Sequence, residues 1–273
     1  MAGHLNSVHK QYLIRLQKIT KEYACGPATV KAVSHASLTL EPGEFVLLQG
    51  MSGSGKTTLL SIMGLLMKPS SGRIQLCGHD VTDMGEGELP NLRLHHIGFI
   101  FQSFNLFPAL TALENVKLAL KLKGFGWNAR RKEAARLLGR VGLEKCMSRK
   151  PGELSGGQRQ RVCIARALAG DVDIILADEP TAALDTTTGL SIMELLKEET
   201  RARNKAAFVV THDPRLEKFA TRVDHIVDGN YTVGASSRTR GATSGVHQGG
   251  GHGPIFKEVA HELPTGHAPQ LTH

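Results

Sequence analysis

The stretch GMSGSGKTT, residues 50–58, restricts the fold of this chain more than any other segment. It follows the continuous apolar run FVLLQ and opens the apolar stretch KTTLLSIMGLLM, so a glycine-rich loop joins a predicted strand to a predicted helix. Gly50, Gly55, Lys56 and Thr57 satisfy the pattern G-x-x-x-x-G-K-[ST]. Glycines let backbone N–H groups surround phosphate oxygens, and the helix N-terminus adds positive potential. The segment therefore predicts a phosphate-binding loop.

Individual residues of this loop have different expected roles. Lys56 is expected to reach the β- and γ-phosphates of a nucleotide, and the Thr57 hydroxyl is expected to coordinate Mg²⁺. The other predicted nucleotide contacts come from the rest of the loop: Gly50, Ser52, Gly53, Ser54, Gly55 and Thr58. Kinases, GTPases and many ATPases share such a loop, so the loop alone leaves the reaction open.

A second apolar run, DIILADEP at residues 173–180, carries two consecutive acids. Four apolar residues precede Asp178, which indicates a buried strand whose carboxylate emerges at the edge of the sheet beside the loop. Asp178 is expected to hold the metal ion, and Glu179 is then available to orient and polarise an attacking water molecule. The pair points to hydrolysis of a nucleotide.

The remaining sequence alternates between strand and helix patterns. Residues 12–20 and 33–40 alternate as half-buried strands, and residues 104–157 read as a mainly helical insertion. Further elements are expected as strands at 45–49, 74–78, 173–180 and 206–213, helices at 56–67, 156–169 and 189–204, and a hairpin at 223–233. Apolar strands lying between helices predict an α/β fold with a parallel sheet covered on both faces.

Composition narrows the possible partners. The net charge is +8, yet no basic run is interleaved with aromatic residues, so a nucleic-acid partner is not expected. The longest apolar stretches fall short of the roughly 18 to 20 residues that span a bilayer, and the first residues lack the apolar segment of a signal peptide. A location in the cytoplasm is therefore expected.

Cysteine and histidine spacing gives no sign of a metal site. The four cysteines have no CxxC spacing, which suggests neither a zinc site nor a disulfide framework: Cys25, Cys77, Cys146 and Cys163. Residues 233–273 are rich in glycine, serine and histidine, and a tail without packed structure is expected there. The histidines of this tail fit no metal-ligand motif: His247, His252, His261, His267 and His273.

The segment LSGGQRQR, residues 154–161, resembles the signature of ABC-type ATPases, and the resemblance covers residues 12–232. Other motifs of that family stand in the expected order: an aromatic residue for adenine (Tyr23), FIFQS with Gln102, TAALD after the acid pair, and VVTHD with His212. The resemblance implies a P-loop NTPase (RecA-like) core, an N-terminal antiparallel β part and a helical subdomain at about 104–157.

The resemblance also implies roles for individual residues. Glu179 would activate water and His212 would contact the γ-phosphate, while Thr57, Gln102 and Asp178 would hold Mg²⁺. Ser155, Gly156 and Gly157 precede a helix, so serine capping and the helix dipole form a second anion site. In the family, two copies dock head to tail, each signature completes the other copy's ATP site, and Asp185 communicates across the dimer.

The segments around Gln102, the signature and the acid pair resemble a group of ABC ATPases that contains the LolD, MacB and FtsE types. The resemblance implies permeases with four membrane helices and a large external domain, and the export or release of lipoproteins, lipids or drugs. A single copy of each motif and no membrane span imply a homodimer of this chain on separate transmembrane permease subunits, at the cytoplasmic face of the membrane. Residues 104–107 would then be either a permease contact or ordinary core packing. Two alternatives are an FtsE-like ATPase that signals to cell-wall enzymes and a nucleic-acid-associated ABC ATPase. Met51 and Val172 stand where relatives usually carry proline.

Overall fold

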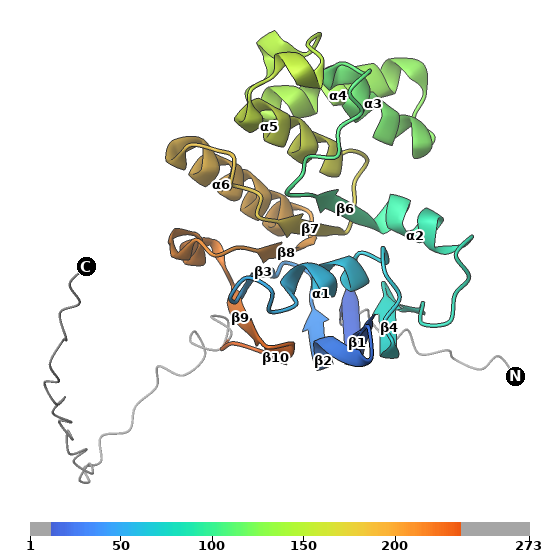
Figure 1. Ribbon diagram of the computed structural model, residues 1–273. Helices are drawn as coiled ribbons and strands as arrows, with labels where there is room; N and C mark the ends of the chain where they lie inside the picture. The colour runs from blue at the N-terminus through green and yellow to red at the C-terminus, as the bar shows by residue number, and fades with distance from the viewer. Residues whose placement is uncertain (1–11, 236–273) are drawn as a thin grey trace, which may run out of the picture. The chain divides into compact units, whose positions relative to one another are not determined.

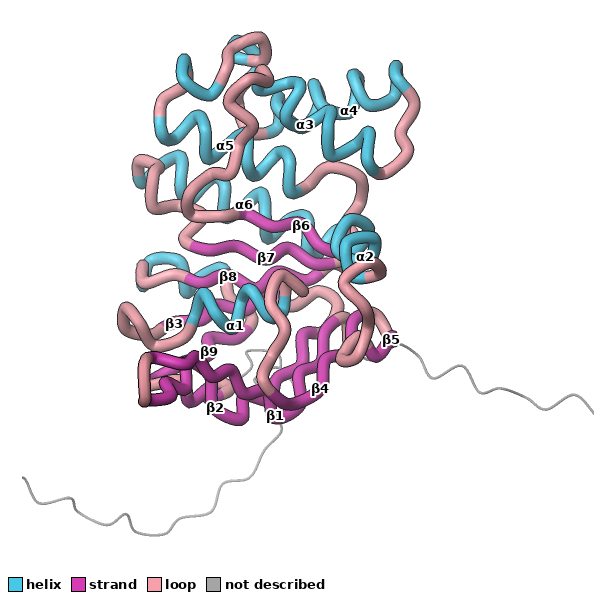
Figure 2. The backbone as a smooth tube through the Cα atoms, turned by 45° about the vertical axis from the view of Figure 1, so that its right-hand side comes forward, coloured by secondary structure: helices cyan, strands magenta, loops and turns pink. Residues whose placement is uncertain are grey.

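The computed structural model describes residues 12–235 of the 273-residue chain. The strands it describes form one sheet in the order β5-β4-β1-β2-β10-β9-β3-β8-β7-β6. From residue 236 on, the glycine- and histidine-rich tail lies outside the described residues. Within the described residues, no helix combines the length and apolar character needed to cross a membrane. Figure 1 shows the labelled elements and Figure 2 shows the sheet from a second side.

Four strands make the antiparallel part of the sheet. β1 (Ile14–Cys25) pairs with β2 (Ala28–Leu40) on one side and with β4 (Ser71–Leu76) on the other, and the short β5 (His79–Asp80) extends β4. Alternate residues of β1 and β2 are buried, as expected for strands with one face on the core. Both strands run further than the predicted ranges, because their paired tips carry exposed side chains that break the alternation.

The parallel part contains the strands that carry the predicted motifs. β9 (Arg222–Val227), β3 (Phe45–Gln49), β8 (Ala206–Val210), β7 (Ile174–Asp178) and β6 (Ile97–Ile100) pair in parallel in that order, and β10 (Asn230–Thr232) turns back antiparallel along β9. β10 also meets β2, at the single pair Asn230 and Ser34. Because β3, β6, β7 and β8 run in one direction, their carboxyl ends and the loops that follow share one edge.

Both faces of the parallel strands are buried, and successive side chains enter different cores. In β3, Val46 and Leu48 join the core that contains α1 and the antiparallel strands. Phe45 and Leu47 join the core that contains the helical region and α6. β7 and β8 divide in the same way, which explains why these segments read as continuous apolar runs.

The helices fall into two groups. α1 (Lys56–Met63) and α2 (Leu89–His96) border the antiparallel part, whereas α3 (Ala112–Leu122), α4 (Trp127–Arg140) and α5 (Gly156–Ala167) form the helical region at the top of Figure 1. α6 (Thr186–Ala202) packs on β8 and contributes to the core that also contains the helical region. Three short 3₁₀ segments are η1 (Glu144–Cys146), η2 (Pro151–Glu153) and η3 (Pro214–Phe219).

Sequence patterns missed three elements and misplaced the start of another. The sequence patterns did not predict β5, α2 or β6, and β4 begins at Ser71, before the predicted start at residue 74. α1 ends at Met63 and not at residue 67, because Leu65 adopts a left-handed φ of 54° and the Leu66 N–H donates back to the Ser61 carbonyl at 2.9 Å. α3 and α4 lie inside the expected helical insertion.

A buried charge cluster fastens β9 to the start of β3. The Arg222 guanidinium lies 3.0 Å from Glu44 Oε1 and 3.0 Å from Asp224 Oδ1, and it donates to the Thr39 carbonyl at 3.0 Å. The side chains of Arg222, Glu44 and Asp224 are 8%, 5% and 0% exposed. The carboxylates therefore depend on this guanidinium for charge compensation.

Replacing Arg222 with alanine should lower the free energy of unfolding by about 3–5 kcal/mol, because two carboxylates stay buried beside a missing cation. The melting temperature should fall by about 6–20 °C in a chain of this size. Urea unfolding and differential scanning calorimetry measure both quantities. Arg136→Ala is the matched control: it removes a more exposed ion pair with Glu133 and should cost less than about 1 kcal/mol. Equal losses in the two variants would contradict this reading.

Candidate functional site

A cavity of about 470 Å³ opens where β3, β6, β7 and β8 end at their shared edge. Most residues predicted from the phosphate loop, the acid pair and the later motifs line it. They are Gly50, Ser52, Gly53, Gly55, Lys56, Thr57, Thr58, Gln102, Asp178, Glu179 and His212. The structure thus brings together residues that are separated by more than 100 positions in the chain.

Glycine conformations shape the loop on one wall of this cavity. Gly53 has φ 78° and Gly55 has φ 104°, a region that side chains with a Cβ rarely adopt. A Cβ on Gly55 would also lie 2.0 Å from the Ala32 carbonyl oxygen, so this position excludes any larger residue. Gly55 caps α1 without a side-chain hydrogen bond. The first N–H groups of α1 are therefore available to an anion.

Lys56 and Ser54 complete the loop in different ways. Lys56 Nζ donates to the carbonyl oxygens of Gly50 at 2.9 Å and Met51 at 2.5 Å, which holds the ammonium group over the cavity wall. Ser54 does not line the cavity, and its buried Oγ has no hydrogen-bond partner among the described residues. The loop thus offers a cation and a cradle of glycines at one place, a combination suited to phosphate.

Two oxygen atoms that suit a divalent cation lie next to each other in the cavity lining. Thr57 Oγ1, in the first turn of α1, donates to Asp178 Oδ2, at the end of β7, over 3.1 Å. Burial raises the pKa of Asp178, while the Thr57 hydrogen bond and the charge of Lys56 lower it. Gln102 adds an amide oxygen to the same lining. Hydroxyl, carboxylate and amide oxygens are the ligands that Mg²⁺ prefers, so the donor set fits that ion.

Glu179 points to a different partner from its neighbour Asp178. Its Oε1 lies 2.8 Å from Nδ1 of His212, and the two side chains are 11% and 76% exposed. Glu179 has a positive φ of 47°, and its backbone N–H donates to the Val210 carbonyl at 3.0 Å. This turn aims one acid at Thr57 and the next at His212. The two carboxylates can therefore do different work, one on a metal ion and one on a proton.

The signature residues lie outside this cavity. Ser155 caps α5, where its side chain accepts from the Gln158 backbone N–H and Gln158 reciprocates in a capping box. Gly156 and Gly157 open the helix beside Ala183, and Asp185 caps the neighbouring α6 through Thr188. The chain therefore presents a second helix N-terminus suited to an anion, separate from the first.

Tyr23 also lies outside the cavity lining. Its side chain is 38% exposed, its hydroxyl contacts Met67 Sδ at 3.0 Å, and Lys21 Nζ lies 5.5 Å from the ring centroid. In contrast, Ala32 and Val210 line the cavity although sequence reasoning missed them. Neither residue could be identified from the sequence, because each is a small or apolar strand residue that strand pairing alone brings to the site.

The fold, the phosphate-binding cavity and the separate glycine-rich helix end define an ATPase class, and the chain belongs to the ABC transporter family, which matches its residues 33–182. It is 46% identical over 221 residues to the uncharacterized ABC transporter ATP-binding protein MJ0796 of Methanocaldococcus jannaschii, covering 80% of this chain and 94% of that protein. The predicted family and fold class are thereby confirmed.

Two further comparisons concern assembly and transport. The dimeric structure of a post-hydrolysis state of the ATP-binding cassette MJ0796, bound to ADP and Pi, matches with a TM-score of 0.78 and 44% identity, over 80% of this chain and 96% of that one. The macrolide export ATP-binding/permease protein MacB of Hyphomonas neptunium is 43% identical over 217 residues, which is 80% of this chain. The match spans 34% of MacB, so about a third of that protein corresponds to this chain.

Proposed function

We propose that this chain is the ATP-hydrolysing motor subunit of a membrane transporter of the MacB and LolD type, and that two copies close on two ATP molecules. The observation that carries the proposal is that the predicted site residues lie in two separate places on the chain. The cavity holds the loop, the metal donors and Glu179, whereas the capped end of α5 lies outside it. A head-to-tail dimer would bring the α5 end of each copy to the cavity of the other.

Each cavity residue then has a role in hydrolysis. Lys56 and the N–H groups of the loop bind the β- and γ-phosphates, and Thr57, Asp178 and Gln102 hold Mg²⁺, which would neutralise charge on the phosphates. Glu179 Oε1 orients a water molecule and takes its proton, while His212, 2.8 Å away, fixes that carboxylate and faces the γ-phosphate. Ser155, Gly156 and Gly157 of the second copy supply further donors to the γ-phosphate, and Asp185 lies beside that contact.

Tyr23 remains the proposed adenine contact, at the edge of the site and outside the cavity lining. Its ring is partly exposed, and the ring face already attracts the Lys21 ammonium group. A base could stack on this ring from solvent without entering the cavity. The phosphate groups would then supply most of the binding free energy.

An apolar groove of about 300 Å³ is the proposed permease contact. It lies between β6 and α3 and includes Phe101, Asn105 and Phe107. Phe107 is 52% exposed, whereas Leu106 packs on the main core and the Phe104 ring lies 5.2 Å from the Arg159 guanidinium carbon. The apolar cluster at 104–107 therefore combines the two roles considered from sequence, with Phe107 as the exposed contact.

Affinity capture from membranes tests this function. A tagged Glu179→Gln chain with ATP should retain a permease with four membrane helices and a large external domain, identified by mass spectrometry. Adding Phe107→Asp should reduce its recovery at least about tenfold, because a charge is then placed in the apolar contact. Trp127→Asp, at another exposed aromatic residue, is the matched control and should leave recovery unchanged. Recovery of nucleic acid or soluble proteins without a membrane protein would contradict the transport role.

A further inference from the structure

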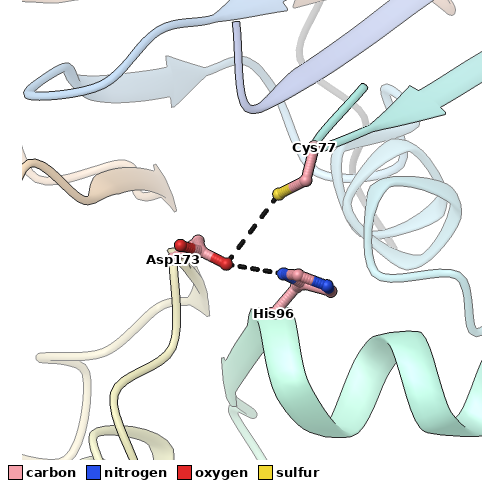
Figure 3. A group of neighbouring side chains, drawn as sticks. All are labelled: Cys77, His96 and Asp173. Carbon is pink, nitrogen blue, oxygen red and sulfur yellow. Dashed lines mark hydrogen bonds and ion pairs between the residues drawn. The ribbon is translucent and has the colours of Figure 1, made fainter. Parts of the chain in front are cut away.

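Three side chains with metal-binding atoms meet at the opposite edge of the sheet from the nucleotide cavity. Cys77 lies in the turn between β4 and β5, His96 ends α2, and Asp173 directly precedes β7. Their Sγ, imidazole nitrogen and carboxylate oxygen atoms all lie within 4.8 Å of one another (Figure 3). His96 Nδ1 is 2.6 Å from Asp173 Oδ2, and Cys77 Sγ is 3.9 Å from the same oxygen.

Backbone hydrogen bonds hold these three residues in place. The Asp173 N–H donates to the His96 carbonyl at 3.1 Å, directly before the β6 and β7 ladder begins, and the Ala206 N–H donates to the Asp173 carbonyl at 2.9 Å. The Cys77 N–H donates to the Leu13 carbonyl at 2.8 Å. The three ligand atoms therefore converge through sheet pairing, which positions them more firmly than a free loop would.

Burial and charge in this cluster suit a cation. Cys77 is 2% exposed, whereas the side chains of His96 and Asp173 are 26% and 45% exposed, so an ion could enter from the carboxylate side. The neighbouring ammonium groups bind elsewhere: Lys123 Nζ donates to the Ala169 carbonyl at 2.7 Å, and Lys205 Nζ pairs with Asp171 at 3.1 Å. Among the described residues the Asp173 carboxylate pairs with His96 and with no lysine or arginine, although Lys123 is near enough for a longer-range attraction.

We propose that Cys77, His96 and Asp173 bind a divalent cation of the zinc class. A thiolate, an imidazole and a carboxylate are all zinc ligands, with bonds of about 2.0–2.3 Å, and ligand atoms of a tetrahedral site then lie about 3.3–3.8 Å apart. The imidazole and the carboxylate need to separate by less than about 1 Å to admit the ion. On binding, the thiol releases its proton to water and His96 coordinates through unprotonated Nδ1, while water fills the fourth position.

Such an ion would link three segments that lie far apart in the sequence. Cys77 belongs to the antiparallel part of the sheet, Asp173 to the parallel part and His96 to the helix that leads into β6. Binding to the folded chain alone stabilises it by mass action. The site would therefore make stability of the motor dependent on metal without touching the nucleotide cavity. Cysteine spacing gave no sign of it, because the ligands come together only in the folded chain.

Cobalt absorption of the full-length chain tests the proposal, with Co²⁺ as the spectroscopic probe for zinc. A thiolate ligand gives an intense ligand-to-metal band in the near ultraviolet, which histidines in residues 236–273 cannot produce, because that segment has no cysteine. We expect one such site per chain, displaced by Zn²⁺. Cys77→Ser should abolish the band, whereas Cys25→Ser, at an exposed cysteine, should preserve it. Absence of the band in the unsubstituted chain, or its survival in Cys77→Ser, would overturn the proposal.

A second pair of variants separates metal binding from a folding defect. His96→Gln should weaken Co²⁺ binding by about 10- to 100-fold or more, and His95→Gln, at the exposed neighbouring residue, should have no effect. Zn²⁺ at a hundred times its Kd should raise the melting temperature by about 5–10 °C, and His96→Gln should remove that rise. Equal binding by His96→Gln and His95→Gln would mean that zinc binds elsewhere in the chain, which also overturns the proposal.

Discussion

Glu179→Gln is expected to reduce steady-state ATP hydrolysis by about 10²- to 10⁴-fold, the usual contribution of a general base, while ATP binding stays within about twofold. Glutamine has nearly the same volume and can still accept from His212 over the 2.8 Å now spanned by the carboxylate. It cannot take a proton from water. The proposed metal ligands Thr57 and Asp178 form a separate hydrogen-bonded pair and remain in place. The variant should therefore bind ATP and form the dimer, and the dimer should not dissociate because its ATP is not hydrolysed.

Phosphate release, a fluorescent nucleotide titration and size-exclusion chromatography measure these three properties. Asp178→Asn is the informative comparison, because it removes a proposed metal ligand and not the base. Its activity should recover in part at high Mg²⁺, whereas that of Glu179→Gln should not. Near-normal turnover by Glu179→Gln would remove Glu179 from the role of base, and identical Mg²⁺ responses would mean that the two carboxylates share one role.

The cavity was predictable because its residues stand where strands end. Runs such as FVLLQ and DIILADEP read as strands buried on both faces, and the structure places one on each side of β8. Once the strands are parallel, the residues that follow them share an edge, so the phosphate loop and the acid pair must meet. The glycines at 53 and 55 could be recognised for a separate reason, because both have a positive φ, which favours glycine.

Elements with weak periodicity escaped prediction. α2 has eight residues, of which Leu89 alone is buried, so its sequence shows no amphipathic stripe. β6 has four residues and follows α2 without a loop, which leaves no turn signal between them. β6 is stabilised by its pairing with β7, and α2 packs against β6. Local pattern could not reveal them, nor the cluster of Cys77 with His96 and Asp173 that they help to build.

The sequence also did not predict where some residues lie relative to the cavity. Tyr23 was matched by position to an adenine contact, yet strand pairing places it near Met67 and Lys21, outside the cavity. Ala32 shows the reverse case, because an unremarked small residue on β2 supplies the carbonyl that Gly55 approaches. The position of Tyr23 follows from the register between β1 and β2, which shifts at several points. Such shifts leave no reliable trace in the sequence.

Lys56→Ala is expected to weaken ATP binding by about 100-fold or more and to remove hydrolysis with it. The ammonium group would make charge-assisted hydrogen bonds to two phosphates, each worth about 1.5–3 kcal/mol, and alanine replaces neither. Stability should change little, because Lys56 is only partly buried and its present partners, the Gly50 and Met51 carbonyls, lie at the loop surface. Isothermal titration calorimetry with ATP measures the affinity, and thermal unfolding without nucleotide checks the fold. Lys31→Ala, at an exposed lysine paired with Glu22, is the matched control and should bind ATP normally. ATP binding and turnover both intact in Lys56→Ala would mean that the loop does not hold the phosphates, and the division of the site between two copies would then lose its chemical basis.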